Sequence, residues 1–260
     1  MDLNEVFETL DRQDYSGSLF HPRPASGATP TGAQDYKIPV ADGVTLGARW
    51  HRFDPALPTV LFFHGNGEVV SDYDDIAPAY EEIDLNLFVV DFRGYGWSTG
   101  RPSLRGLKED GPRVADFFLE ELQKSTEKPP SPFLMGRSLG SSPACEIAGS
   151  HGDYFAGLIL ESGFASVLPL LQLLGVDAGV DDEVVDELFS NHRKLAGVQL
   201  QTLLIHGDQD HLIPVAHAHD NYAHLPHDRK TLRTIPAAGH NDLMLFGDYF
   251  GAISDFVTGE

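Results

Sequence analysis

Several residue types are scarce in this sequence, and each scarcity excludes a class of protein. Cys145 is the sole cysteine among 260 residues, so the chain forms no disulfide within itself and no cysteine-based metal cluster. It lies in an apolar stretch, and we interpret it as a small buried side chain rather than a nucleophile. No apolar run approaches the roughly 20 residues that span a bilayer. The first residues also lack the basic and apolar regions of a signal peptide. We therefore expect a cytoplasmic protein without a membrane span.

Positive charge is scarce as well. Lys and Arg together number 18 against 39 Asp and Glu, which gives a formal net charge of −21. A surface of this sign repels nucleic-acid phosphates and anionic lipid head groups, so we expect neither kind of partner. With 42% hydrophobic residues the chain can bury the core of one sizeable α/β domain or of two small ones. No linker divides it, and oligomeric state leaves no signal in the sequence.

The first 34 residues differ in pattern from the rest. Prolines and glycines interrupt residues 1–34 after a short helical stretch at Leu3–Leu10, so we predict an irregular N-terminal leader. Its role is open: it covers the sheet edge, mediates assembly or is partly disordered. From Tyr36 onward the periodicity is regular, and Asp42-Gly43 between two apolar segments predicts a hairpin. We assign residues 35–260 to a single domain.

Short apolar runs alternate with longer segments of helical spacing over the next 200 residues or so. Runs that are apolar on both faces are typical of parallel strands covered on both sides. The predicted strands are Thr59–Phe63, Asn86–Phe92, Pro132–Met135, Gly157–Leu160, Leu200–Ile205 and Lys230–Ile235. The predicted helices are a segment at 104–122, which Gly111-Pro112 either starts or kinks, and Ser138–His151, Asp181–Leu195, Val215–His224 and Asp242–Val257. This alternation favours a doubly wound α/β sheet with its ligand site at the carboxyl ends of the strands.

One strand-to-helix junction carries a chemical signature. Residues 136–140 read Gly-Arg-Ser-Leu-Gly, a G-x-S-x-G motif directly between a predicted strand and a predicted helix. A serine held on a sharp turn needs neighbours without side chains, and the helix N-terminus favours developing negative charge. The motif alone is weak, since a capped glycine-rich turn gives the same letters. Its context makes Ser138 a candidate nucleophile.

A serine hydroxyl needs a base, and the base needs a carboxylate to orient it. On this type of fold the chain order is Ser, then Asp or Glu, then His. Downstream of Ser138, an apolar strand runs into His206-Gly207-Asp208-Gln209-Asp210, and a later strand is followed by Gly239-His240. Ser138, Asp210 and His240 therefore fall in the required order, each at a strand end. Asp208 is the alternative carboxylate.

The end of an earlier strand supplies a candidate oxyanion hole. Residues 64–67 read His-Gly-Asn-Gly, a loop whose backbone N–H groups can face an oxyanion. We predict that the backbone N–H groups of Asn66 and Leu139 form the hole. We interpret His64 as a structural residue that ties the loop together.

From about Tyr36 to the C-terminus, these motifs together resemble the α/β-hydrolase superfamily. Within it, the chain is similar to small, lid-poor serine hydrolases such as depalmitoylase-like proteins and unassigned bacterial esterases. The matching blocks are residues 64–67, 91–98, 136–140, 206–210 and 239–240. The resemblance implies a mostly parallel eight-stranded sheet with helices on both faces, and only a short cap at about residues 163–198. It also implies Ser138 as nucleophile, Asp210 as acid, since the second Asp of its block is the match, and His240 as base, with no cofactor and no metal.

The implied activity is that of a serine esterase or thioesterase of class EC 3.1, acting on small to medium acyl groups through an acyl-enzyme. Two alternatives stay open: a serine peptidase or amidase of the same fold, and a low-turnover receptor that retains the triad. Dehalogenase chemistry needs a carboxylate where Ser138 stands.

Three further features allow more than one interpretation. Tyr95 and Trp97 line the substrate pocket or pack under their loop. The apolar stretch Val167–Leu174 forms one wall of an acyl pocket or packs on the sheet. Histidines crowd residues 206–227, but His217 and His219 do not share a helix face and no metal signature is present, so we interpret them as solvated loop residues.

Overall fold

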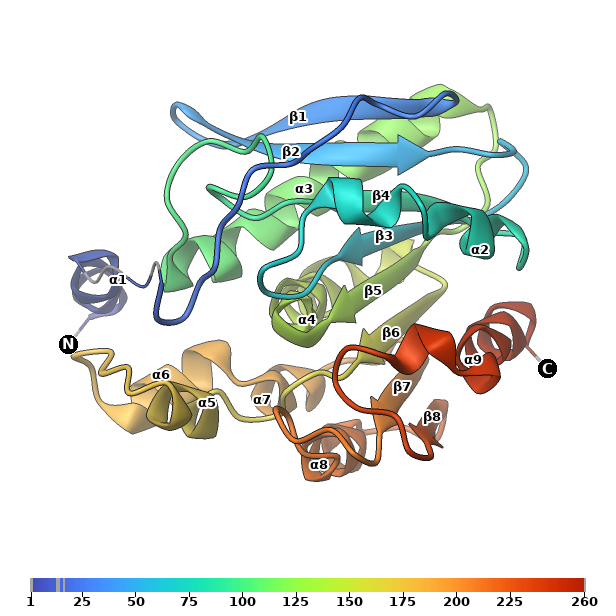
Figure 1. The fold of residues 1–260 in the computed structure, drawn as a ribbon. Helices are drawn as coiled ribbons and strands as arrows, with labels where there is room; N and C mark the ends of the chain where they lie inside the picture. Colours follow the sequence, from blue (N-terminus) through green and yellow to red (C-terminus); the bar gives the residue numbers. More distant parts are fainter. Residues whose placement is uncertain (1, 13–14, 16, 260) are drawn as a thin grey trace.

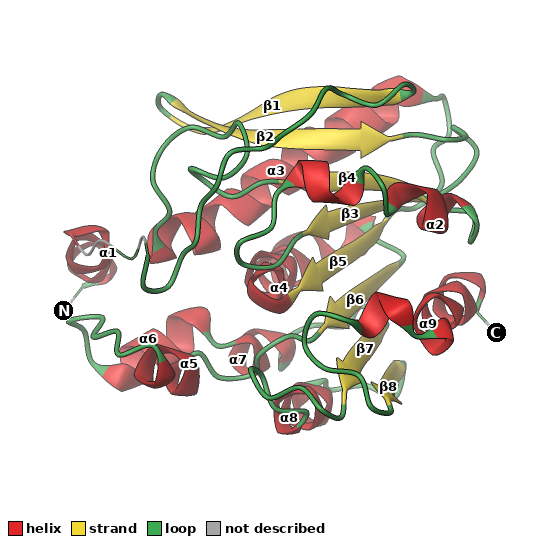
Figure 2. Ribbon diagram, viewed as in Figure 1, coloured by secondary structure: helices red, strands yellow, loops and turns green. Residues whose placement is uncertain are grey.

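Eight strands form one sheet in the order β1-β2-β4-β3-β5-β6-β7-β8. In Figures 1 and 2 the strands follow this order from β1 at the top to β8 at the bottom. The computed structural model describes residues 2–12, 15 and 17–259. Met1 and residues 13, 14, 16 and 260, which belong to the predicted leader and catalytic domain, lie outside the described residues. The strands are β1 (Ala33–Ala41), β2 (Val44–His51), β3 (Thr59–Phe63), β4 (Asn86–Val90), β5 (Phe133–Arg137), β6 (Gly157–Glu161), β7 (Thr202–Gly207) and β8 (Lys230–Ile235).

The pairing of the strands confirms the predicted mostly parallel sheet. β1 and β2 form the hairpin around Asp42-Gly43, and Gly43 has a φ of +72°, which the tight turn requires. β2 also pairs antiparallel with β4, whereas the pairs from β4 and β3 through to β8 are all parallel. The carboxyl ends of β3, β5, β6, β7 and β8 therefore share one edge, where the sequence places its candidate residues.

The central strands are apolar on both faces because both faces are covered. On β3, Leu61 and Phe63 join one buried cluster, and Val60 and Phe62 join another on the opposite face. The helices are α1 (Leu3–Arg12), α2 (Ala77–Glu81), α3 (Leu104–Ser125), α4 (Ser141–His151), α5 (Leu168–Leu173), α6 (Asp182–Phe189), α7 (Asn191–Leu195), α8 (Ala216–His224) and α9 (Gly247–Thr258). The first cluster includes residues of α1, α3 and α4, and the second includes residues of α2 and α9. Figure 1 shows α3 and α4 behind the sheet and α2 and α9 in front of it.

Three predicted helices differ in detail from the structure. The segment predicted as one helix over Asp242–Val257 is a 3₁₀ turn, η4 (Leu243–Leu245), followed after the extended Phe246 by α9. α3 begins at Leu104 with Ser103 as its cap, so Gly111-Pro112 lies inside the helix and does not start it. The segment predicted as one helix over Asp181–Leu195 is divided into α6 and α7 at Ser190, whose backbone is extended. The Ser190 hydroxyl donates to Asp186 and accepts from the backbone N–H of Val167. These side-chain bonds hold Ser190, and its extended backbone separates α6 from α7.

The leader contributes to the same core as the sheet. Val6, Phe7 and Leu10 of α1 are buried, as are Tyr15 and Phe20 in the irregular segment that follows. Between β6 and β7, the region predicted as a short cap contains α5, α6 and α7. No helix in the described part of the chain has both the length and the apolar character that crossing a membrane requires.

Candidate functional site

Ser138 stands on a strained turn at the carboxyl end of β5. Its φ is +50°, an unusual value for a residue with a side chain. The flanking glycines permit this turn because a Cβ on Gly136 would lie 2.3 Å from the Gly140 oxygen, and a Cβ on Gly140 would lie 2.0 Å from the Phe63 oxygen. The short 3₁₀ turn η2 (Ser138–Gly140) and α4 follow directly. The turn therefore presses against the end of β3, where the predicted oxyanion loop begins.

His240 connects Ser138 to Asp210. Its Nε2 atom lies 2.9 Å from Ser138 Oγ, and its Nδ1 atom lies 2.7 Å from Asp210 Oδ2. A carboxylate only accepts hydrogen bonds, so Nδ1 carries the proton and Nε2 is left to accept from the serine hydroxyl. The structure thus brings together the three residues that the sequence predicts as a triad, from the loops after β5, β7 and β8.

Asp210 is held as a carboxylate by several donors. Its Oδ1 atom accepts from the backbone N–H groups of Leu212 at 3.0 Å and Ile213 at 2.8 Å. Burial alone would raise the pKa of Asp210, but hydrogen bonds with His206 and His240 and from the backbone of Ile213 outweigh it and lower the pKa well below its ordinary value. Asp208 instead accepts from the backbone N–H of Ala237 at 2.8 Å and is exposed. Asp210 is therefore the carboxylate that faces His240.

The interpretation of the histidines at 206–227 as solvated loop residues is wrong for His206, which lies in β7 and packs inside the fold. Its side chain is buried, and Nε2 lies 2.7 Å from the Ile213 oxygen and 3.3 Å from Asp210 Oδ2. His206 and His240 therefore both contact Oδ2 of Asp210, and His206 helps to hold the carboxylate. The spacing of four residues between His206 and Asp210 was visible, but only the fold brings the two side chains into contact.

The loop after β3 carries the predicted oxyanion donor Asn66. Leu139, which carries the second predicted N–H, directly follows Ser138 in η2. His64 is buried, with Nδ1 2.8 Å from the Gly65 oxygen and Nε2 3.2 Å from Asp91 Oδ1. Both nitrogens of this ring thus contact protein acceptors, as the structural interpretation of His64 requires. The assignment of the two N–H groups to an oxyanion remains a prediction.

Arg137, the residue before Ser138, links several segments of the site and was missed by the sequence analysis. Its Nε atom lies 3.1 Å from Glu161 Oε1 at the end of β6, and its Nη1 atom forms an ion pair with Glu68 in the loop after β3. Its Nη2 atom donates to the His240 oxygen at 2.9 Å and to Asn241 Oδ1 at 2.8 Å. The Arg137 guanidinium therefore links the strand that precedes Ser138 to three other segments: the end of β6, the loop after β3 and the loop after β8.

The two carboxylates around Arg137 are themselves held by other groups. The Glu68 side chain accepts from the Gly65 N–H and from the Tyr73 hydroxyl, both at 2.7 Å, and Glu161 accepts from the Tyr249 hydroxyl at 2.8 Å. Burial raises the pKa of Glu161, although Arg137 and Tyr249 act in the opposite direction. Burial would lower the pKa of Arg137, but Glu161 and Glu68 raise it, so the guanidinium stays charged.

The structure shows where the side chains lie for which the sequence allowed two interpretations. Tyr95 is fully buried and packs on the rings of His64 and Phe92, so it lies under its loop. Trp97 is partly buried and packs over the Arg49 guanidinium at 5.1 Å. In the stretch Val167–Leu174, some side chains pack on the core and others face solvent: Val167 and Leu171 are buried, whereas Leu173 and Leu174 are exposed. No group of three or more His, Cys, Asp or Glu residues in the described ranges is arranged to hold a metal ion.

The sequence and the fold of this chain are similar to those of known proteins. A family model described as "Serine aminopeptidase, S33" matches residues 54–174. The uncharacterized protein YfhR of Escherichia coli strain K12 is 30% identical over 236 residues, which cover 87% of this chain and 79% of YfhR. Protein bem46 of Schizosaccharomyces pombe is 28% identical over 204 residues, 77% of this chain and 67% of bem46. Among solved structures, the esterase Pf2001 of Pyrococcus furiosus has a TM-score of 0.73 at 16% identity, covering 92% of this chain and 98% of that one.

The chain belongs to the α/β-hydrolase superfamily, as its resemblance predicts. The fold, the family model and the serine at the strand–helix turn together support a serine hydrolase of this fold.

Proposed function

We propose that this protein hydrolyses carboxylic esters or thioesters of small to medium acyl groups, class EC 3.1, through an acyl-enzyme on Ser138. The observation that carries the proposal is the continuous series of contacts from Ser138 Oγ through the His240 ring to Asp210, at 2.9 and 2.7 Å, with the serine on a turn of positive φ. A hydroxyl becomes a competent nucleophile in this arrangement because a base is already within hydrogen-bond distance.

Two half-reactions follow from this geometry. Ser138 Oγ attacks the acyl carbonyl while its proton moves to His240 Nε2, and Asp210 stabilises the imidazolium. The carbonyl oxygen, now negative, accepts from the backbone N–H groups of Asn66 and Leu139. The C–O or C–S bond then breaks as His240 gives its proton to the leaving alcohol or thiol. Water repeats the sequence on the acyl-enzyme and releases the acid and free Ser138.

Exposed leucines on the loops that carry the acid and the base support an apolar acyl substrate. Leu212 lies two residues after Asp210 and is 49% exposed, and Leu245 follows His240 on η4 (Leu243–Leu245) and is 85% exposed. Leucines exposed on the two loops that carry the acid and the base offer contact surface for an alkyl chain.

The family model's description makes aminopeptidase chemistry the second candidate. An aminopeptidase needs a free acidic group for the substrate's amino terminus. The carboxylates on the catalytic segments already serve protein donors: Glu68 and Glu161 hold Arg137, and Asp242 accepts from the Gly239 N–H at 2.7 Å. This arrangement favours esters and thioesters over peptides with a free amino terminus.

A substrate panel tests the proposal directly. Nitrophenyl esters and acyl thioesters of rising chain length are compared with aminoacyl anilides, and Ser138→Ala serves as the matched control. We expect the wild type to hydrolyse esters or thioesters with saturation kinetics, and the variant to show no turnover above background. Faster cleavage of anilides would favour the aminopeptidase, and no turnover on any substrate would favour the receptor alternative.

A further inference from the structure

The N-terminal segment runs along the loop that carries Asn66. The Asn66 side chain donates from Nδ2 to the Leu19 oxygen at 2.7 Å, and its Oδ1 accepts from the backbone N–H of His21 at 3.0 Å. These residues are more than 40 positions apart in sequence. Residues 19–23, which we call the strap, therefore bind the oxyanion loop through one carboxamide.

The hydroxyl of the buried Tyr95 contacts both the Asn66 side chain and the strap. Tyr95 Oη donates to Asn66 Oδ1 at 2.6 Å and accepts from the His21 N–H at 2.8 Å. Burial raises the pKa of Tyr95 to about 12, although the backbone N–H groups of His21 and Gly67 oppose the shift. The hydroxyl thus keeps its proton as a donor at neutral pH. Three protein groups engage the Asn66 carboxamide, which directs this side chain to the fold rather than to a ligand.

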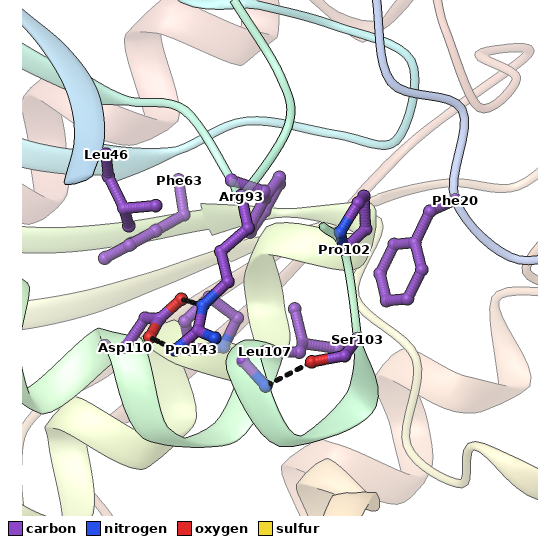
Figure 3. Close-up of a pocket in the computed structure, with 12 residues that line it drawn as sticks. Phe20, Leu46, Phe63, Arg93, Pro102, Ser103, Leu107, Asp110 and Pro143 are labelled. Carbon is purple, nitrogen blue, oxygen red and sulfur yellow. Dashed lines mark hydrogen bonds and ion pairs between the residues drawn. The ribbon is translucent and has the colours of Figure 1, made fainter. Parts of the chain in front are cut away.

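The strap is attached on both sides of these contacts. After His21, Arg23 Nε donates to the Gly67 oxygen at 2.6 Å, its guanidinium pairs with Asp72, and its own oxygen accepts from the Gly96 N–H at 2.9 Å. Before His21, the ring of Phe20 is buried and lines a cavity of about 20 Å³ together with Pro102 and Leu107. Figure 3 shows this ring beside Pro102, and the ion pair of Arg93 and Asp110 among the other residues that line the cavity.

We propose that the strap is a positioning element for catalysis: it fixes the loop so that the Asn66 backbone N–H points at the substrate oxyanion. This inference rests on the proposed function. Within this loop, Glu68 and the His64 ring hold Gly65, whereas the strap and Tyr95 hold the side chain of Asn66. An oxyanion donor contributes fully only when its position is set before the reaction begins. The leader at residues 1–34 therefore completes the active site from outside the hydrolase motifs.

Two substitutions each remove part of the attachment and leave the backbone N–H of Asn66 in place. Asn66→Ala deletes the carboxamide but retains the backbone donor, and Tyr95→Phe deletes only the hydroxyl. Tyr15→Phe is the matched control, because Tyr15 is a buried tyrosine of the same N-terminal segment whose hydroxyl has no hydrogen-bond partner in the described structure. Each variant is compared with the wild type for ester hydrolysis, for inhibition by a trifluoromethyl ketone and for hydrogen exchange of peptides covering residues 59–72.

We expect Asn66→Ala to lower kcat about 10- to 100-fold, somewhat less than the roughly 10²- to 10³-fold cost of losing an oxyanion donor outright. Tyr95→Phe should lower kcat about 3- to 10-fold, as one hydrogen bond suggests. KM should change by less than about threefold, whereas affinity for the ketone, whose adduct carries the oxyanion, should fall with kcat/KM. Hydrogen exchange in the loop should accelerate in both variants and stay unchanged in Tyr15→Phe.

The outcomes separate this inference from the proposed function. Unchanged exchange in both variants would overturn the strap as a restraint, whatever the activity. Faster exchange with unchanged kcat would overturn its role in catalysis. A wild type without ester or thioester turnover would instead overturn the proposed function, and the exchange measurement would still decide whether the strap holds the loop.

Discussion

Arg137 donates a hydrogen bond from Nη2 to the backbone oxygen of His240, across 2.9 Å. The residue before the nucleophile thus holds the loop that carries the base. Because the same guanidinium pairs with Glu68 and Glu161, the spacing between Ser138 and His240 depends on one buried charge and its partners. The triad geometry therefore has a support that the catalytic motifs alone do not contain.

Replacing Arg137 should affect stability and activity separately. In Arg137→Met, the carboxylate of Glu161 stays buried without its cation, which should reduce the free energy of unfolding by about 3–5 kcal/mol. The double variant Arg137→Met with Glu161→Gln removes that charge and should recover part of the stability in urea titrations. It should not recover kcat, because nothing then holds the His240 oxygen. Recovery of full activity in the double variant would contradict this role for Arg137.

Asp210→Asn tests the orientation of His240. An amide at this position can donate to Nδ1, which places the His240 proton on Nε2 and removes the acceptor for the Ser138 hydroxyl. We expect kcat to fall about 10⁴-fold with little change in KM. Asp208→Asn is the matched control and should keep most of the activity. Equal losses in the two variants would argue against Asp210 as the orienting carboxylate.

The pKa directions of two carboxyl groups predict how stability depends on pH. The pKa of Asp210 is lowered, so its contribution to stability is present above its ordinary value of 3.8 and is lost as the pH falls below it. The difference in unfolding free energy between wild type and Asp210→Asn should therefore shrink over that acidic range.

Glu161 should show the opposite sign. Its pKa is raised, so the cost of its charge is present at neutral pH and is relieved as the pH falls toward its ordinary value of 4.5. Relative to Glu161→Gln, the wild type should gain stability as the pH falls in that range. Chemical denaturation at a series of pH values measures both trends. If the differences in unfolding free energy between the wild type and each of the two variants changed in the same direction with pH, the predicted signs would be contradicted.

Replacing Gly140 and Gly149, at the start of α4 and inside it, by alanine should change the stability in opposite directions. Gly140→Ala would place a Cβ 2.0 Å from the Phe63 oxygen, so the turn and the end of β3 must separate, and both stability and activity should be lost. Gly149 lies inside α4, and a Cβ there meets nothing within 4 Å. Gly149→Ala should raise the unfolding free energy by about 0.5–1 kcal/mol and leave kcat unchanged. Thermal unfolding and ester hydrolysis of the two variants measure the contrast.

Local patterns predicted the strands well because apolar runs such as Thr59–Phe63 are covered on both faces of the sheet. The order of Ser138, Asp210 and His240 was also legible, since each follows a strand and parallel strands end at one edge. The division of the segment 181–195 at Ser190 was not legible, because the Ser190 hydroxyl bonds both Asp186 in the same segment and the backbone of Val167, 23 positions earlier.

The contacts that hold the catalytic loops in place were also not predictable, because they join residues far apart in the sequence. Arg137 and Glu161 are 24 positions apart, and Leu19 and Asn66 are 47 apart. No periodicity or motif joins such pairs, and only the folded sheet and the path of the strap bring them together. The sequence pattern around Phe20 did not show that this residue is buried, because the residues that cover it belong to α3 and the neighbouring loops.

The most direct test of the central claim is intact-mass analysis after treatment with a fluorophosphonate, applied to the wild type, Ser138→Ala and His240→Ala. We expect one adduct on the wild type, none on Ser138→Ala and much slower labelling of His240→Ala, because the serine reacts only when its base is present. Peptide mapping should place the adduct on Ser138. A folded wild type that forms no adduct, or an adduct that persists in Ser138→Ala, would contradict Ser138 as an activated nucleophile.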